Sequence, residues 1–187
     1  MDVSIAAASL YQSSVVWDPL PRVEWYVVHT NSRHEVKVEV GLRQKGVEVF
    51  LPRVRVRSRR RDRLRMIDVP LFPGYLFVYS DLNDRDYYHI LRQEGVILIL
   101  GIKGQLTPVP EETVTSISAL VNSGQPILPW TRLEPGRRVR VVDGPLQGAS
   151  GVIVRKKTGK TRLVINVELL GRSVYTELSE ETVELIN

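Results

Sequence analysis

A chain of 187 residues with 43% hydrophobic and 25% charged residues has the composition of a soluble globular protein with one or two domains. Its formal net charge of +5 favours a polyanionic partner. The absence of cysteine excludes a disulfide framework and thiolate metal sites, and no apolar run approaches the roughly 20 residues that span a bilayer. We therefore expect a cytoplasmic protein with no membrane partner.

The chain begins with residues 1–23, which we predict to be a flexible extension with at most a short helix at Ile5–Gln12. No apolar period is sustained there, and Pro19 and Pro21 interrupt regular structure. The β-branched and aromatic run Trp25–Thr30 then predicts the first strand.

A helix is predicted next, over residues 32–45. Ser32 and Glu35 have the spacing of a capping box, and Gly46 is a typical stop signal. The alternation of valines at 36, 38 and 40 also fits a strand, but the i,i+4 pair of Glu39 and Arg43 favours the helix. Val47–Leu51 is predicted as the following strand.

The segment Arg53–Arg65 contains eight arginines and predicts a basic β-hairpin. Strands are expected at Arg53–Arg57 and Leu64–Val69, with a turn at Ser58–Arg63. One interpretation is a merely solvated hairpin. The other is an arm that contacts phosphates, because so many like charges are unfavourable together unless a polyanion is bound.

The stretch Pro70–Val78 follows, with a sharp turn at Gly74 and then an aromatic strand. Side chains alternate along a strand, so Tyr75 and Phe77 share one face while Leu76 and Val78 share the other. If the aliphatic pair faces a core, the aromatic pair is either covered by a second layer or forms an exposed patch for a partner.

Three further elements complete the first domain. A short helix capped by Asn83 is predicted to run to Arg92, a buried strand is predicted at Val96–Leu100, and a helix begins at Pro110. The order of elements predicts an α+β fold, with helices packed on a mainly antiparallel sheet over residues 24–123.

A linker is expected at residues 124–134, followed by a small five-stranded β-barrel at 135–187. Gly144, Pro145, Gly148 and Gly151 are expected to form its tight turns, with positive φ at the glycines. The strands are predicted at Arg138–Val142, Gly151–Lys156, Thr161–Glu168, Ser173–Leu178 and Thr182–Leu185.

Two motifs resemble a known family. Trp25-Tyr26-Val27-Val28 and Pro70–Val78 are similar to the N-terminal domain of NusG-type transcription elongation factors, and Gly136–Gly151 is similar to the KOW motif that follows it. The sequences of Pro70–Tyr75 and Val167–Val174 resemble specialised RfaH-like and UpxY-like members of the family more than its housekeeping factor. These specialised members regulate operons such as those for polysaccharide biosynthesis.

The resemblance implies an elongation and antitermination factor that binds the clamp coiled coil of RNA polymerase and suppresses pausing and termination. The polymerase-binding residues it implies are Phe72, Pro73, Tyr75, Phe77, Val27, His29 and Ile102. Nucleic-acid contacts, to the non-template strand or the upstream duplex, are implied for a second set: Asn31, Arg33, Lys37, Gln44, Lys45, Arg57, Arg59, Arg60, Arg61 and Arg63.

The KOW domain is implied to bind ribosomal protein S-ten or a termination factor, and the chain is expected to be a monomer. Basic residues from Arg155 to Arg162 would serve RNA or protein contact, or only solvation. The alternative function is a KOW-type RNA-binding ribosomal or assembly protein.

An enzyme is not expected, because the sequence contains no nucleophile motif, P-loop or metal-ligand spacing. We likewise expect no cofactor and no metal.

Overall fold

The computed structural model describes residues 22–58, 65–130, 136–155, 161–178 and 182–186. The expected extension therefore lies outside the described residues, except for its last two positions. The elements of the first domain are β1 (Glu24–Thr30), α1 (Glu35–Gln44), β2 (Glu48–Phe50), β3 (Arg53–Arg57), β4 (Met66–Pro70), β5 (Tyr75–Ser80), α2 (Asp84–Leu91), β6 (Val96–Ile99), β7 (Gly101–Ile102), β8 (Gln105–Leu106) and α3 (Glu111–Asn122).

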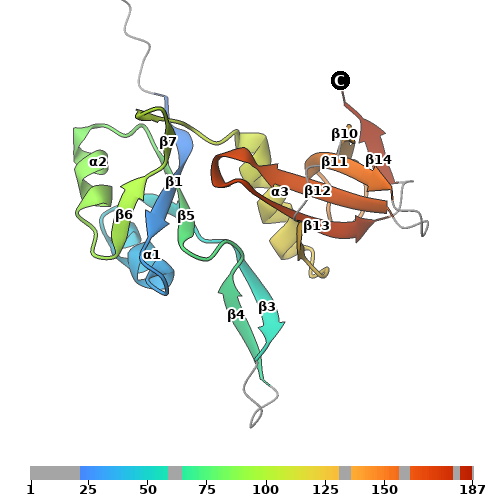
Figure 1. The fold of residues 1–187 in the computed structure, drawn as a ribbon, viewed down its shortest axis with the longest axis horizontal. Helices are drawn as coiled ribbons and strands as arrows, with labels where there is room; N and C mark the ends of the chain where they lie inside the picture. The colour runs from blue at the N-terminus through green and yellow to red at the C-terminus, as the bar shows by residue number, and fades with distance from the viewer. Residues whose placement is uncertain (1–21, 59–64, 131–135, 156–160, 179–181, 187) are drawn as a thin grey trace, which may run out of the picture.

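The first domain is built on an antiparallel sheet of order β2-β5-β1-β6. One face carries Val28, Leu76 and Val78, which pack in a buried cluster with apolar residues of α1 and α2. The other face carries Val27 and Phe77, which belong to a separate cluster shared with α3. The α+β class is confirmed, and α1 and α2 cover one face of the sheet while α3 covers part of the other (Figure 1).

Helix α1 forms as predicted, but the capping box is wrong. His34 is the N-cap residue and makes no side-chain capping bond. Glu35 is therefore the first helical residue (N1), whereas a capping box requires the glutamate two positions later, at N3. Its buried carboxylate instead accepts a hydrogen bond of 2.8 Å from the backbone amide of Gly74.

Strand β6 forms where the sequence predicts it, but its side chains are more exposed than predicted. It lies at an edge of the sheet, where Ile97 and Leu98 are 48% and 41% exposed. A continuous apolar run is typical of a strand covered on both faces, but here only Ile99 is buried.

Strands β3 and β4 form a separate two-stranded ribbon that projects away from both domains (Figure 1). The pairing of Arg55 with Asp68, and of Val56 with Ile67, gives the ribbon a cationic face and an apolar face. This confirms the hairpin, while residues 59–63 of its predicted turn and residue 64 of its predicted second strand lie outside the described residues.

The second domain is a small antiparallel barrel, with strand order β14-β10-β11-β12-β13-β9. Strand β9 lies within the expected linker and pairs with β13, so the connection is partly built into the second domain's sheet. The elements are β9 (Leu128–Trp130), β10 (Arg137–Val141), β11 (Ser150–Arg155), β12 (Thr161–Val167), a 3-10 turn at Glu168–Leu170, β13 (Arg172–Leu178) and β14 (Val183–Leu185).

Helix α3 lies between the two domains and contacts β1 on one side and β11 and β12 on the other (Figure 1). It places Val114, Ile117 and Leu120 in the same cluster as core residues of the first sheet and of the barrel. In the described part of the chain, no helix is both long and apolar enough to cross a membrane.

The barrel glycines serve two different purposes. Gly144 and Gly148 have φ of +84° and +85°, as predicted for tight turns beside Pro145. Gly151 instead lies within β11, where a Cβ atom would be 2.5 Å from the carbonyl oxygen of Val164. The expectation of a turn at Gly151 is wrong, because the residue is needed for close approach of two strands.

Candidate functional site

The candidate partner surface is the face of the first sheet that does not carry α1 and α2. His29 pairs with Tyr75 on β5 and with Leu98 on β6, so these three side chains form one row across the sheet. Val27 pairs with Phe77 in a row two residues further along. The two rows lie on the same face and have different surroundings.

The inner row is core. Val27, Phe77 and the neighbouring Phe72 are fully buried in the cluster that includes α3. The rings of Phe72 and Phe77 meet edge to face with centroids 6.2 Å apart. The sequence left open whether a second layer would cover this side of the strand, and α3 provides that layer.

The outer row is accessible. His29 and Tyr75 are half-buried, with their rings stacked at 4.9 Å, and Leu98 is 41% exposed. Ile102, which is 56% exposed, follows shortly after on β7, and Pro73 is exposed in the preceding turn. We call His29, Tyr75 and Leu98 the open row. Leu98 was missed because only strand pairing shows that it lies opposite His29.

Two hydrogen bonds fix the turn that presents Tyr75. Gly74 has a φ of +86°, which a side chain would disfavour. Its amide donates to Glu35, and its carbonyl oxygen accepts from the amide of Thr30 at 2.8 Å. Helix α1 and strand β1 therefore hold the turn together, and Tyr75 begins β5 at a defined position.

The barrel reaches the open row through Arg172 on β13. The guanidinium carbon of Arg172 lies 5.0 Å from the ring centroid of Tyr75, a cation–π distance. Its Nη1 atom also donates to the carbonyl oxygen of Pro73 at 3.3 Å. One barrel side chain thus contacts two residues that the sequence assigned to a partner.

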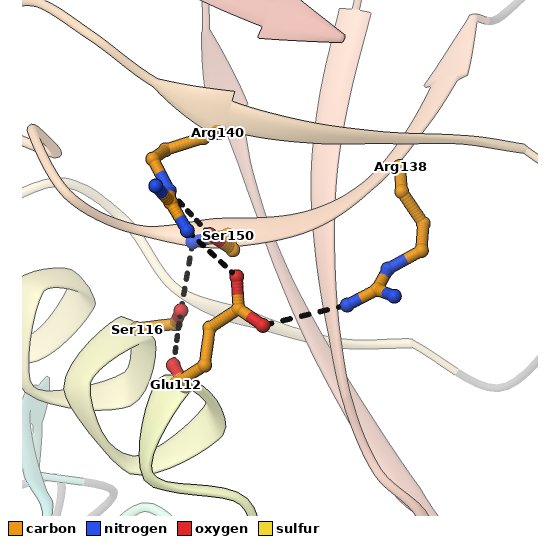
Figure 2. A network of polar contacts seen from close by, with 5 residues as sticks. All are labelled: Glu112, Ser116, Arg138, Arg140 and Ser150. Carbon is orange, nitrogen blue, oxygen red and sulfur yellow. Dashed lines mark hydrogen bonds and ion pairs between the residues drawn. The ribbon is translucent and has the colours of Figure 1, made fainter. Parts of the chain in front are cut away.

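A polar network joins α3 to the barrel (Figure 2). The buried Ser116 hydroxyl donates to the carbonyl oxygen of Glu112 at 2.6 Å and accepts from the amide of Ser150 at 2.7 Å. The Glu112 carboxylate pairs with Arg138 and Arg140 of β10, each at 3.4 Å. These contacts hold the domains together by polar groups as well as by the shared apolar cluster.

The Ser150 hydroxyl and the two guanidinium groups hold the pKa of the Glu112 carboxyl below its ordinary value of 4.5. Docking lowers the pKa of this carboxyl. At pH values above the pKa of the undocked form, the ionised carboxylate therefore stabilises the docked state. That contribution is lost as the pH falls through the lowered pKa.

We expect Glu112→Gln to raise the undocked population of the chain at neutral pH, on the order of threefold for a partly exposed pair. The chain has no cysteine, so cysteines introduced at Lys103 and Glu184 can carry two spin labels. Distances measured between the labels should lengthen in the parent chain as the pH falls below about 4.5, and less steeply in Glu112→Gln. Identical pH profiles would exclude Glu112 from docking.

The predicted nucleic-acid residues of α1 and its flanks are only partly occupied by contacts within the chain. Lys37 pairs with Glu94 at 2.5 Å, and Lys45 donates to the carbonyl oxygen of His89 at 3.3 Å. Asn31, Arg33 and Gln44 are exposed at the surface. The structure therefore distributes these five residues along α1 and its two ends, and only Lys45 has a hydrogen bond with α2 among the described residues.

The arginines of the β3–β4 ribbon also include residues that are paired within the chain and residues that are exposed. Arg53 pairs with the buried Glu39 of α1, and Arg55 pairs with Asp68 across the ribbon at 3.4 Å. Arg57 is exposed towards the end of β3. The remaining predicted contacts, Arg59, Arg60, Arg61 and Arg63, lie outside the described residues, as do Lys156, Lys157 and Lys160 of the barrel.

Two of the three histidines make local contacts, whereas the Nδ1 atom of the third, His89, is buried without a hydrogen-bond partner. His29 stacks on Tyr75, and His34 Nδ1 lies 3.1 Å from the carbonyl oxygen of Ser32. Within the described ranges, no group of three or more metal-ligating side chains comes together.

Comparisons with known proteins agree with the fold. The family model "NusG: Transcription termination factor nusG" matches residues 23–118. The transcription termination/antitermination protein NusG of Pseudomonas aeruginosa is 29% identical over 174 residues, which cover 87% of this chain and 98% of the relative. The corresponding protein of Escherichia coli K12 is 31% identical over 176 residues, which cover 88% and 97%.

A solved structure described as "Domain interaction in Thermotoga maritima NusG" aligns with a TM-score of 0.50 and 26% identity. It covers 89% of this chain and 98% of the matched chain. The alignment extends over both domains and the connection between them.

Proposed function

Because this chain belongs to the NusG family of transcription termination factors, we propose that it is an elongation and antitermination factor that binds RNA polymerase through the open row. The observation that carries the proposal is the row of His29, Tyr75 and Leu98 across strands β5, β1 and β6, accessible on one face of the sheet. Accessible aromatic and aliphatic side chains on rigid strands are typical of interface anchors.

The polymerase element proposed as the partner is the clamp coiled coil. An apolar helical pair fits a row of side chains on a sheet, because its own apolar ridge supplies the complementary surface. Val27 and Phe77 form the next row on the same face and are buried with Phe72 in the cluster of α3, and the exposed Pro73 precedes Tyr75 in the turn. The residues proposed to contact the polymerase are therefore those of the open row, including Leu98, in place of the buried aromatic residues.

Binding at Tyr75 competes with the barrel. Arg172 already lies on the Tyr75 ring and bonds to Pro73, so the polymerase must displace this contact to use the whole open row. A binding-competent form that is only partly populated lowers the apparent affinity in proportion to its population. We propose that the barrel's displacement also frees it for its own partner, ribosomal protein S-ten or a termination factor.

We propose that DNA is the second partner. Exposed Arg33 and Arg57 provide charge on α1's flank and on the projecting ribbon, and phosphate neutralisation gives binding that weakens with salt. Regulation of particular operons, such as those for polysaccharide biosynthesis, is part of this proposal and is supported by the sequence resemblance alone. The ribosomal alternative gains no support, because the matched relatives are transcription proteins.

The proposal is tested by transcription with purified RNA polymerase on a template that carries a pause and a terminator. Added protein is expected to shorten the pause and to increase the fraction of transcripts that pass the terminator. Unchanged pause lifetimes and unchanged readthrough at saturating protein would contradict the proposal.

A further inference from the structure

Tyr88 on α2 is the aromatic side chain that the first domain leaves most open. It is 53% exposed, whereas the other aromatic side chains that the structure describes are buried or half-buried. Its neighbour Tyr87 packs edge to face against it at 5.7 Å and is half-buried. The fold therefore needs Tyr87 for packing and leaves the Tyr88 ring at the surface.

A planar cation lies beside this ring. The guanidinium carbon of Arg92 is 5.3 Å from the Tyr88 ring centroid. Arg85, Tyr88 and Arg92 are separated by three and four positions, so they occupy one stripe along α2. An aromatic ring between two arginines of this stripe is suited to a nucleotide, because the base can stack on the ring or on a guanidinium plane and the phosphate can pair with arginine.

The same region gathers further positive charge, and two of its acids are engaged in contacts within the chain. Lys45 donates to the carbonyl oxygen of His89, the residue after Tyr88, which brings an ammonium group to α2. Asp86 accepts from the Ser80 hydroxyl at 2.9 Å, and Glu94 pairs with Lys37. Asp84 remains exposed at the start of the helix and disfavours phosphate there.

We propose that Tyr88 is a stacking platform for an unpaired base of single-stranded DNA, with Arg92 beside it and Lys45 at the phosphates. The strand crosses the C-terminal half of α2, away from Asp84, and continues onto Gln44 at the end of α1. This inference rests on the proposed DNA contact and adds to it a group that binds the base and not the backbone.

Stacking accounts for the site better than charge alone. Phosphate neutralisation needs only cations, and it does not explain why an aromatic ring is kept between arginines at the surface. Stacking also tolerates every base, because each base has a π face. The predicted ligand class is therefore a single strand of any sequence, with affinity lost where bases are missing.

The experiment compares two labelled single strands of about twelve nucleotides, a length within the usual range for such sites. One strand carries a base at every position, and the other has abasic residues at its centre. Both strands have the same number of phosphates and therefore equal charge. Fluorescence anisotropy with the full chain gives both affinities over a range of salt concentrations. The variants are Tyr88→Leu, Tyr88→Phe and, as a matched cationic control on the ribbon, Arg57→Ser.

The parent chain is expected to bind the abasic strand about fivefold or more weakly than the based strand. Tyr88→Leu should abolish this difference, and Tyr88→Phe should retain it. Arg57→Ser should weaken binding of both strands alike and lower the salt slope, by about 0.7 for one lost contact.

Two results would overturn the inference and differ in what else they exclude. If Tyr88→Leu still discriminates between the strands, stacking at Tyr88 is wrong while the DNA contact stands. If the parent chain binds neither strand in a salt-dependent manner, the DNA part of the proposed function fails as well. Loss of polymerase affinity in Tyr88→Leu with unchanged strand binding would assign this face to a protein contact.

Discussion

Replacing Phe77 by alanine is expected to lower the free energy of unfolding by about 3–5 kcal/mol, the usual cost of removing a buried phenylalanine. Phe77 is fully buried and contacts Phe72 and Phe50 through its ring, with centroids 6.2 and 6.0 Å away. Its cluster also contains α3 and core residues of the barrel. The loss should therefore be felt in both domains.

Urea denaturation followed by tryptophan fluorescence measures this effect. Ile102→Ala is the matched control, because it truncates an exposed side chain of the same surface and should change stability by less than about 0.5 kcal/mol. A comparably small loss in Phe77→Ala would mean that the ring is not core. It would return Phe77 to the set of candidate partner contacts.

This prediction separates stability from binding. Weak polymerase binding by a Phe77 variant could arise from unfolding, because the side chain supports the sheet from within. Tyr75, His29 and Leu98 are the positions at which binding can be tested with less damage to the fold. Among these, Tyr75 also contacts Arg172, so its replacement changes domain docking at the same time.

The regular elements were largely predictable from local patterns. Alternation of arginine and valine gave β3 at Arg53–Arg57, and Asn83 caps α2 by accepting from the amide of Asp86 at 3.0 Å. Both features depend on neighbours within a few residues. The barrel strands also agree to within one or two positions, because tight turns at Gly144 and Gly171 separate them.

The errors share a physical cause, which is that the deciding partner is distant in the sequence. Glu35 bonds to Gly74, 39 residues away, and no local pattern contains that partner. Leu98 is at an edge because no further strand among the described residues pairs with β6, and a window of five apolar residues cannot contain that information. Gly151 depends on the neighbouring strand at Val164.

The candidate site was predicted in outline by the resemblance and rearranged by tertiary packing. The aromatic residues of Pro70–Val78 do lie together, but α3 buries Phe72 and Phe77 and leaves Tyr75 accessible. Helix α3 was predicted from its own sequence, yet the face of the sheet that it covers was not. The contact of Arg172 with Tyr75 crosses 97 positions and joins two domains, so composition and spacing gave no signal for it.

The open row makes a sharp prediction about two neighbouring residues. Leu98 lies on the row with His29 and Tyr75, whereas Ile97 is the extra residue of a β-bulge and pairs with no residue of that row. Their exposed fractions are similar, at 41% and 48%, so an aspartate at either position disturbs the edge strand to a comparable degree. Only the aspartate at 98 places a charge in the proposed apolar contact, where it is desolvated without a partner.

The most direct measurement is therefore the affinity of purified Leu98→Asp and Ile97→Asp chains for immobilised RNA polymerase, compared with the parent chain. Leu98→Asp should bind about tenfold or more weakly, as expected when an interface anchor is replaced, and Ile97→Asp should bind like the parent. Circular dichroism and thermal unfolding of both variants provide the check on folding. Equal affinities for the two folded variants would contradict binding of the polymerase at the open row.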